Sequence, residues 1–272
     1  MSWEVILLIL LAAFVCELID SSLGMLYGTI LSPTLIIAGF DPLIVVPSIL
    51  LSQSVGSLIA SVMHHKLKNV NFYVKPDITP PRPGTDLFDL LKKNTSQDLK
   101  VVLVITITGV VTTVLAAAAA IHIPKEILKT YIGVLVLAMG IILLLKTKFK
   151  FSWKKVFGVG LISAFNKGVS GGGFGPVVTS GQIISGRSAR KSIGTTALSE
   201  APICIAGFLT YWIINGMSDW SLVLILTIGS IFGALIGPLI TAKIRSEKIL
   251  ILALGIIVTL LGLWTLSKTW IL

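Results

Sequence analysis

A glycine-rich stretch inside an apolar region is the feature that most restricts what this chain can fold into. Residues 166–176 read Asn-Lys-Gly-Val-Ser-Gly-Gly-Gly-Phe-Gly-Pro, between apolar residues at 156–165 and at 177–184. Glycine loosens the backbone and proline removes a hydrogen-bond donor, so we expect a helix to break here. Within a membrane, broken backbone is tolerated only where protein buries it or where it lines a water-filled cavity. The stretch therefore predicts an internal site.

Composition places the chain in a lipid bilayer. It has 272 residues, of which 54% are hydrophobic and 12% are charged, whereas soluble domains have about 25% charged residues. A net charge of +10 would suggest nucleic acid as the partner of a soluble protein. Here the basic residues cluster between apolar runs, as the positive-inside rule requires, and we expect no nucleic acid partner. We predict an all-α, multi-pass protein of the plasma membrane. The start, Met-Ser-Trp-Glu, lacks the basic region of a cleaved signal peptide.

The apolar runs indicate two related halves. Two pairs of runs, 5–16 with 25–38 and 156–165 with 177–185, are too short to span a bilayer singly, since a spanning helix needs about 20 residues. The residues from Ser21 align with those from Ser170 at an offset of 149, and Gln53 aligns with Glu200 at an offset of 147. We predict a first repeat at 1–145 and a second at 146–272, each a re-entrant or broken helix pair followed by three transmembrane helices.

The distribution of Lys and Arg predicts how the halves are oriented. If each interrupted pair enters and leaves on one side, the halves are inverted, and 18 basic residues lie in cytoplasmic loops against 3 outside. If each pair makes one net crossing, the split is 13 against 8. The inverted arrangement fits the charge rule better, and it puts both termini outside. The loop at about 64–99 is then cytoplasmic, with a surface helix at 86–93, and His64 and His65 lie at the membrane interface.

Four charged residues remain at membrane depth: Lys167, Glu17, Asp20 and Glu200. Intramembrane ionisable groups are costly and usually functional, and free N–H groups at a helix start attract anions. We therefore expect a small anion to bind where the two breaks meet, at Lys167, Asn166, Ser170, Gly171, Gly172, Gly173, Ser21, Ser22 and Gly24. Coupling to protons or sodium is assigned to intramembrane polar residues, namely Glu17, Asp20, Gln53, Ser199 and Glu200.

The same residues also have structural interpretations. The glycines could pack a helix crossing while Lys167 extends its amine to an interface. Glu17 and Asp20 could neutralise Lys167, or Asp20 could cap the second half-helix. No set of His, Cys, Asp and Glu has metal-ligand spacing, so we expect no metal and no cofactor. The sequence leaves the oligomeric state open.

The chain resembles the TauE/SafE family of sulfite and organosulfonate exporters. The resemblance rests on the two glycine-containing breaks (residues 18–24 and 168–176), on the Ser/Thr-rich helix after each break (47–53 and 194–200) and on the basic segment 65–72. It implies a plasma-membrane transporter that moves small sulfur-containing or carboxylated anions outward. Two departures, Ser21-Ser22-Leu23-Gly24 in place of several glycines and the charge of Lys167, leave room for a substrate other than sulfite.

Three functions are compatible with these features. The first is a secondary transporter that exports small anions such as sulfite or organosulfonates by alternating access, and broken segments at matching places in two halves are typical of that class. A passive anion channel would share every feature except the coupling acids. An intramembrane enzyme would use Ser170 as nucleophile and Lys167 as base, but an enzyme gives no reason for two equivalent breaks, and we do not expect one.

Overall fold

The computed structural model describes residues 2–73, 95–119, 125–145, 151–216, 219–244 and 246–270. The residues so described form ten α-helices, and none of them lies in a β-strand. The helices are α1 (Trp3–Leu23), α2 (Tyr27–Ile37), α3 (Pro42–Lys66), α5 (Gln97–Ala119), α6 (Lys125–Leu144), α7 (Trp153–Ser170), α8 (Phe174–Ile184), α9 (Ala189–Asn215), α10 (Trp220–Lys243) and α11 (Glu247–Trp270). The predicted surface helix at 86–93 lies outside the described residues.

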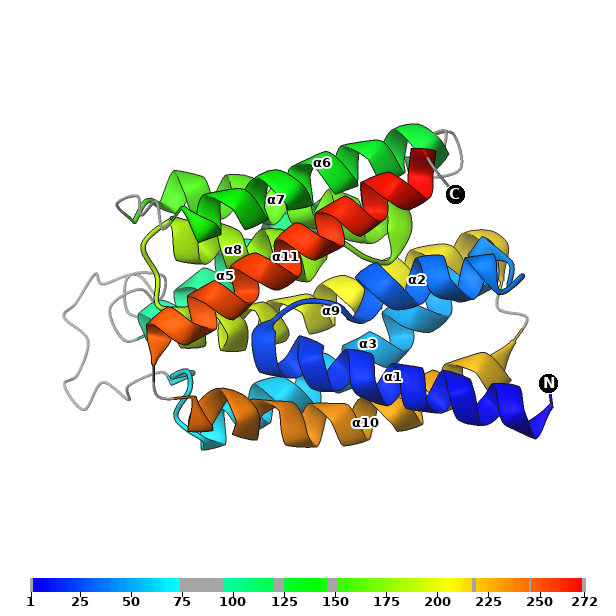
Figure 1. The fold of residues 1–272 in the computed structure, drawn as a ribbon, viewed down its shortest axis with the longest axis horizontal. Helices are drawn as coiled ribbons and strands as arrows, with labels where there is room; N and C mark the ends of the chain where they lie inside the picture. The colour runs from blue at the N-terminus through cyan, green and yellow to red at the C-terminus, as the bar shows by residue number, and fades with distance from the viewer. Residues whose placement is uncertain are drawn as a thin grey trace, which may run out of the picture.

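The helices lie side by side with roughly parallel axes (Figure 1). In this view α1 runs leftward from the N-terminus, and α2 turns back to the right after the first break. The second break is entered from the opposite end, because α7 runs rightward and α8 returns to the left. The two ends of the chain lie on the same side of the molecule.

Each broken pair packs against helices of the other half of the chain. Helix α1 packs along α10, and α7 packs along α5, while α3 and α9 meet in the centre. Three glycines on α10, at positions 229, 233 and 237, face the backbone of α1, where an added methyl group would overlap its atoms. Small residues at such crossings let membrane helices approach closely. Helices α6 and α11 pack mainly on each other (Figure 1).

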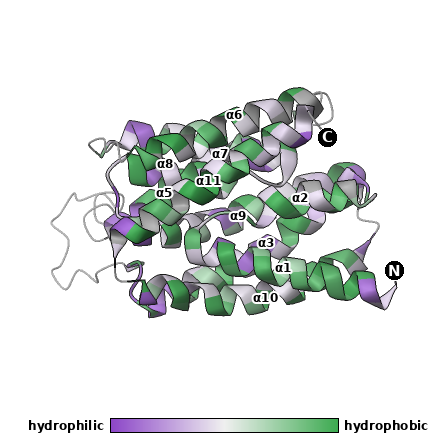
Figure 2. Ribbon diagram, viewed as in Figure 1, coloured by the Kyte–Doolittle hydropathy of each residue, from purple (hydrophilic) through white to green (hydrophobic). Residues whose placement is uncertain are grey.

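The outer surface is apolar and the interior is rich in polar groups. Large apolar side chains are exposed along the helices, among them Ile213, which is 81% exposed, and Leu7, which is 66% exposed. Figure 2 shows that hydrophobic residues, in green, predominate along the helices. Buried polar residues include Lys167, Glu200 and Glu17. Within the described residues, five helices (α1, α3, α5, α9 and α10) are long and apolar enough to cross a membrane. This is the arrangement of a multi-pass membrane protein, whose solvent is lipid.

The breaks are shorter than the apolar runs predict. Helix α1 continues through the polar residues 17–22 to Leu23, and α7 continues to Ser170. The Ser21 hydroxyl donates to the Glu17 carbonyl at 2.6 Å, and the Ser170 hydroxyl donates to the Asn166 carbonyl at 2.8 Å. Because these hydroxyls are satisfied by carbonyls one turn back, they do not interrupt the helix. Between α1 and α2, and between α7 and α8, only residues 24–26 and 171–173 are non-helical.

The boundaries of the helices around the breaks repeat at an offset of 147. Helices α1 and α7 end at 23 and 170, α2 and α8 begin at 27 and 174, and α3 and α9 begin at 42 and 189. The predicted offset of 149 at the first break is therefore wrong, because it matched serines and glycines by residue type. With the corrected offset, Asp20 occupies the place of Lys167, while Gln53 still occupies the place of Glu200.

The end of α3 also differs from the prediction. His64 is fully buried rather than at an interface, and its Nε2 donates to the Ser21 carbonyl at 2.8 Å. Nearby, an ion pair of 2.7 Å joins Arg187, in the turn between α8 and α9, to Asp98 at the start of α5. Burial lowers the pKa of Arg187, and the Asp98 carboxylate opposes that shift. These contacts hold the helix ends on the side opposite the termini.

Candidate functional site

The two breaks lie against each other in the middle of the molecule. Gly28, in the first turn of α2, approaches the second break so closely that an added methyl group would collide with the carbonyl oxygen of Gly171. Gly175, in the first turn of α8, packs in the same way against the backbone of Gly24 and Met25. Only residues without a side chain fit these positions. The glycines therefore bring the starts of both half-helices to one place.

Left-handed residues end the first helix of each pair. Gly24 has φ 77° and its N–H donates to the Asp20 carbonyl, and Gly171 has φ 70° and donates to the Lys167 carbonyl. Two residues later, Gly173 has φ 73°, but the equivalent residue is Leu26, with φ 139°. A positive φ at leucine costs of the order of 1–3 kcal/mol and is found mainly at ligand sites and switch regions.

Backbone N–H groups at the starts of α2 and α8 donate hydrogen bonds to side chains from elsewhere in the chain. Asp20 Oδ1 accepts from the Tyr27 N–H at 3.2 Å, so the carboxylate caps α2. At the second break, the Gly173 N–H donates to the Thr29 hydroxyl of α2 at 3.1 Å. A helix start has N–H groups without intrahelical partners and a partial positive charge, and both favour an anion.

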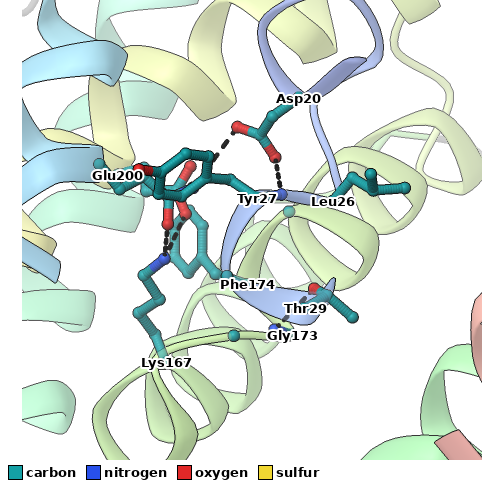
Figure 3. A pocket seen from close by; sticks show the side chains of 12 residues that line it. Asp20, Leu26, Tyr27, Thr29, Lys167, Gly173, Phe174 and Glu200 are labelled. Carbon is teal, nitrogen blue, oxygen red and sulfur yellow. Dashed lines mark hydrogen bonds and ion pairs between the residues drawn. The ribbon is translucent and has the colours of Figure 1, made fainter. Parts of the chain in front are cut away.

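A buried chain of charged and polar side chains crosses the space between the breaks (Figure 3). Lys167 Nζ donates to Glu200 Oε1 at 2.9 Å and also donates to Gln53 Oε1. Gln53 Nε2 in turn lies 3.4 Å from Asp20 Oδ2. The exposed fraction is 1% for Lys167 and 2% for Glu200. Lys167 is therefore paired with Glu200, on α9, rather than with Glu17 or Asp20.

These residues line a small pocket between the two breaks. The pocket leaves essentially no room for a water molecule, so in this conformation the side chains fill it. The lining residues come from both halves of the chain: Asp20, Leu26, Tyr27, Gly28, Thr29, Gln53, Lys167, Gly172, Gly173, Phe174, Gly175 and Glu200. The pocket combines one cation, two carboxylates and the starts of two helices, which are the groups needed to hold a small anion and a proton.

The structure brings six of the predicted site residues to this pocket and leaves eight outside its lining. Those at the pocket are Lys167, Gly172, Gly173, Asp20, Gln53 and Glu200. Among the others, Gly171 and Gly24 shape the breaks, and the hydroxyls of Ser21, Ser22, Ser170 and Ser199 donate to backbone carbonyls. Ser170, the predicted nucleophile of an enzyme, also accepts from the Gly172 N–H at 3.2 Å.

Two predicted residues have buried side chains without a hydrogen-bond partner among the residues that the structure describes. Both carboxylate oxygens of Glu17 lack one, as do both side-chain polar atoms of Asn166. Glu17 faces α3 and α10, where added methyl groups on Gly56 and Gly233 would touch it. It therefore lies beside the pocket rather than in it.

The sequence analysis missed the aromatic residues of the pocket. Tyr27 and Phe174 are each the first residue of a half-helix, and both are fully buried. The Tyr27 hydroxyl lies 2.9 Å from the Ser52 hydroxyl and donates to the Leu226 carbonyl. The offset of 147 pairs the two aromatic residues, so correct alignment of the breaks would have found them.

Comparison with known proteins agrees with this architecture. The family described as "Sulfite exporter TauE/SafE" matches residues 85–265, about two thirds of the chain. The chain belongs to the TauE/SafE family. A relative from Bacillus subtilis (strain 168), named "Probable membrane transporter protein YtnM", is 28% identical over 269 residues, which cover 94% of this chain and 80% of the relative. No solved structure matches the chain. The family and the name of the relative both support a membrane transporter.

Proposed function

We propose that this TauE/SafE protein is a secondary transporter that moves small anions, such as sulfite or organosulfonates, across the plasma membrane. The observation that carries the proposal is Lys167, a buried cation between two helix breaks. A buried cation is costly, and in membrane proteins such groups mark substrate or ion pathways. The starts of α2 and α8 add partial positive charge on either side of it.

The substrate is a small anion with several acceptor oxygens. Sulfite and sulfonate groups meet this requirement, because their oxygens can accept hydrogen bonds from an ammonium and from backbone N–H groups together. Phe174 and Tyr27 add an apolar wall beside the cation. The family description names sulfite export, and we propose outward transport of sulfite or an organosulfonate on that basis.

Alternating access is the proposed mechanism, and inverted repeats are its basis. Three features support an inverted repeat, and the first two are the constant offset of 147 around the breaks and the opposite directions from which the breaks are entered (Figure 1). Reciprocal packing of α1 on α10 and of α7 on α5 is a third. Rocking of one half against the other would then open the same pocket to each side in turn.

The proposed orientation has both termini outside. Lys66, Arg187 and Lys243 follow or end helices on the side opposite the termini, where the positive-inside rule expects the cytoplasm. Cysteine-accessibility labelling in intact cells tests this orientation: cysteines introduced at Ser2 and at Lys243 should react with an impermeant reagent only at the first position.

Transport in proteoliposomes tests the function. We expect vesicles with wild-type protein to release sulfite, sulfoacetate or isethionate faster than protein-free vesicles. The double variant Lys167→Met/Glu200→Gln should lose at least about nine tenths of that rate, because the anion loses its cation. Because both members of the ion pair are removed, neither is left buried without its partner. The matched control is Lys154→Met, since Lys154 is exposed on the same helix.

Two results would contradict this function. One is that no tested anion moves faster than in protein-free vesicles. The other is that the double variant, folded and reconstituted in equal amount, transports at the wild-type rate. A flux that follows only the anion's electrochemical gradient, at channel-like rates, would favour a passive channel instead.

A further inference from the structure

Lys167 is already engaged in the closed pocket, so an anion must compete for it. Its ammonium group donates to Gln53 Oε1 and to Glu200 Oε1, and the Cys204 thiol lies beside it. Of these neighbours only Glu200 carries a negative charge. An arriving anion would therefore meet a cation whose charge a carboxylate 2.9 Å away already balances.

The charges of the pocket add a second constraint. Lys167 contributes one positive charge, and Asp20 and Glu200 contribute one negative charge each. The empty pocket thus has a net charge of minus one when its acids are ionised. A singly charged anion that entered alone would double this charge in a buried place, where desolvation makes unbalanced charge expensive. A proton that enters with the anion keeps the charge unchanged.

Glu200 is better placed than Asp20 to accept that proton. The Asp20 carboxylate caps α2 by accepting from the Tyr27 N–H, and it also faces Gln53. The Glu200 carboxylate has Lys167 as its hydrogen-bond donor among the described residues. Once the anion takes this donor, the Glu200 oxygen is free to bind a proton.

The surrounding titratable groups are consistent with this exchange. They are Lys167 on α7, Asp20 and Glu17 on α1, Tyr27 on α2 and Cys204 on α9 itself. The described parts of α3, α5 and α8 bring no charged side chain to the pocket. Among the described residues Lys167 is the one cation in the pocket lining, so no second positive group there can take over its charge when the anion binds.

We propose that an anion displaces the Glu200 carboxylate from Lys167 while Glu200 takes up one proton from the same side, so that each singly charged anion crosses together with a proton and without net charge. In this exchange the ion pair Lys167–Glu200 is replaced by the ion pair Lys167–anion, and the proton forms an O–H bond on Glu200. Release on the other side reverses both steps and restores the original pair. The inference rests on the proposed transport function and specifies its coupling ion.

The experiment uses isethionate, a sulfonate that keeps a single negative charge near neutral pH. Proteoliposomes with wild-type protein are clamped to chosen voltages with potassium and valinomycin, while labelled isethionate uptake and luminal pH are recorded together. We expect an uptake rate that changes less than about twofold between zero and 100 mV of either sign, against the roughly fiftyfold of a singly charged flux. We also expect one luminal proton gained per isethionate.

The variant Glu200→Gln separates coupling from transport. We expect it to gain at least about tenfold fewer protons per isethionate than the wild type, because an amide cannot accept the proton. The control Glu4→Gln, an exposed acid on α1, should keep the wild-type ratio. If Glu200→Gln does not fold, the wild-type voltage and proton measurements decide the question alone.

Each outcome bears on a defined part of the reasoning. Voltage-driven isethionate uptake without proton entry, or uptake that follows sodium instead of protons, overturns the exchange but leaves the transport function standing. Proton coupling that persists in Glu200→Gln at the wild-type ratio also overturns it. If isethionate moves in neither the wild type nor the control, and the other anions are equally inert, the transport function itself is refuted.

Discussion

Removal of the Lys167 charge should destabilise the protein more than removal of the whole ion pair. Lys167 and Glu200 are almost fully buried and 2.9 Å apart. Lys167→Met leaves the Glu200 carboxylate in the interior without its partner, and breaking a buried pair in this way costs about 3–5 kcal/mol. For a chain of this size about 1 kcal/mol shifts the midpoint of thermal unfolding by 2–4 °C. The expected decrease is therefore about 6–20 °C.

The double variant Lys167→Met/Glu200→Gln should recover most of this loss. It removes both members of the pair, so neither is left buried without its partner, and neutral replacements of buried pairs are often tolerated. The exposed Lys154→Met should change the midpoint by less than about 2 °C, since such substitutions are usually within 0.5 kcal/mol.

A thiol-reactive fluorescent dye can report the unfolding, because Cys16 and Cys204 are both free and buried. All variants are heated in the same detergent at one scan rate, since membrane proteins often unfold irreversibly. A single variant as stable as the wild type would refute the reasoning, as would a double variant no more stable than the single one. Either result would mean that the pair is not a buried, charged contact.

Two further predictions use the same thermal assay. Gly28→Ala should destabilise the protein by about 1–3 kcal/mol, because its methyl group would overlap backbone atoms of Gly171 and Gly172. The control Gly158→Ala, whose methyl group would meet no atom of the described residues within 4 Å, should be neutral or stabilise its helix by up to about 1 kcal/mol. Equal effects of the two substitutions would argue against contact between the breaks. Glu17→Gln should leave the stability within about 1 kcal/mol of wild type or raise it, because neither Glu17 oxygen has a donor to lose among the described residues. A decrease of more than about 3 kcal/mol would reveal a charged partner.

Much of the helical layout follows from apolar run lengths and from glycine. The second break could be predicted because glycine readily adopts positive φ, and Gly171 and Gly173 both do so in the structure. The four intramembrane charges could be identified from the sequence alone, because charged residues are rare between apolar runs. The resemblance to TauE/SafE was confirmed by the family match.

The register of the repeat and the partner of Lys167 could not be predicted in the same way. Residue types around the first break favoured an offset of 149, whereas backbone geometry gives 147, since Leu26 takes a conformation normally left to glycine. The partner of Lys167 depends on how α9 lies against α7, and periodicity within each helix holds no information on that contact. The roles assigned to Asn166, Ser170 and the coupling acids remain predictions.

The length of the half-helices determines how strongly the pocket senses membrane voltage. Helices α2 and α8 have 11 residues each, and at 1.5 Å per residue each spans about 16 Å. This is about half of the roughly 30 Å hydrocarbon thickness. A unit charge that reaches Lys167 from either side therefore crosses about half of the electric field, worth about 1.2 kcal/mol at 100 mV. Even a cycle without net charge should thus produce transient currents when the anion and the proton bind at different moments.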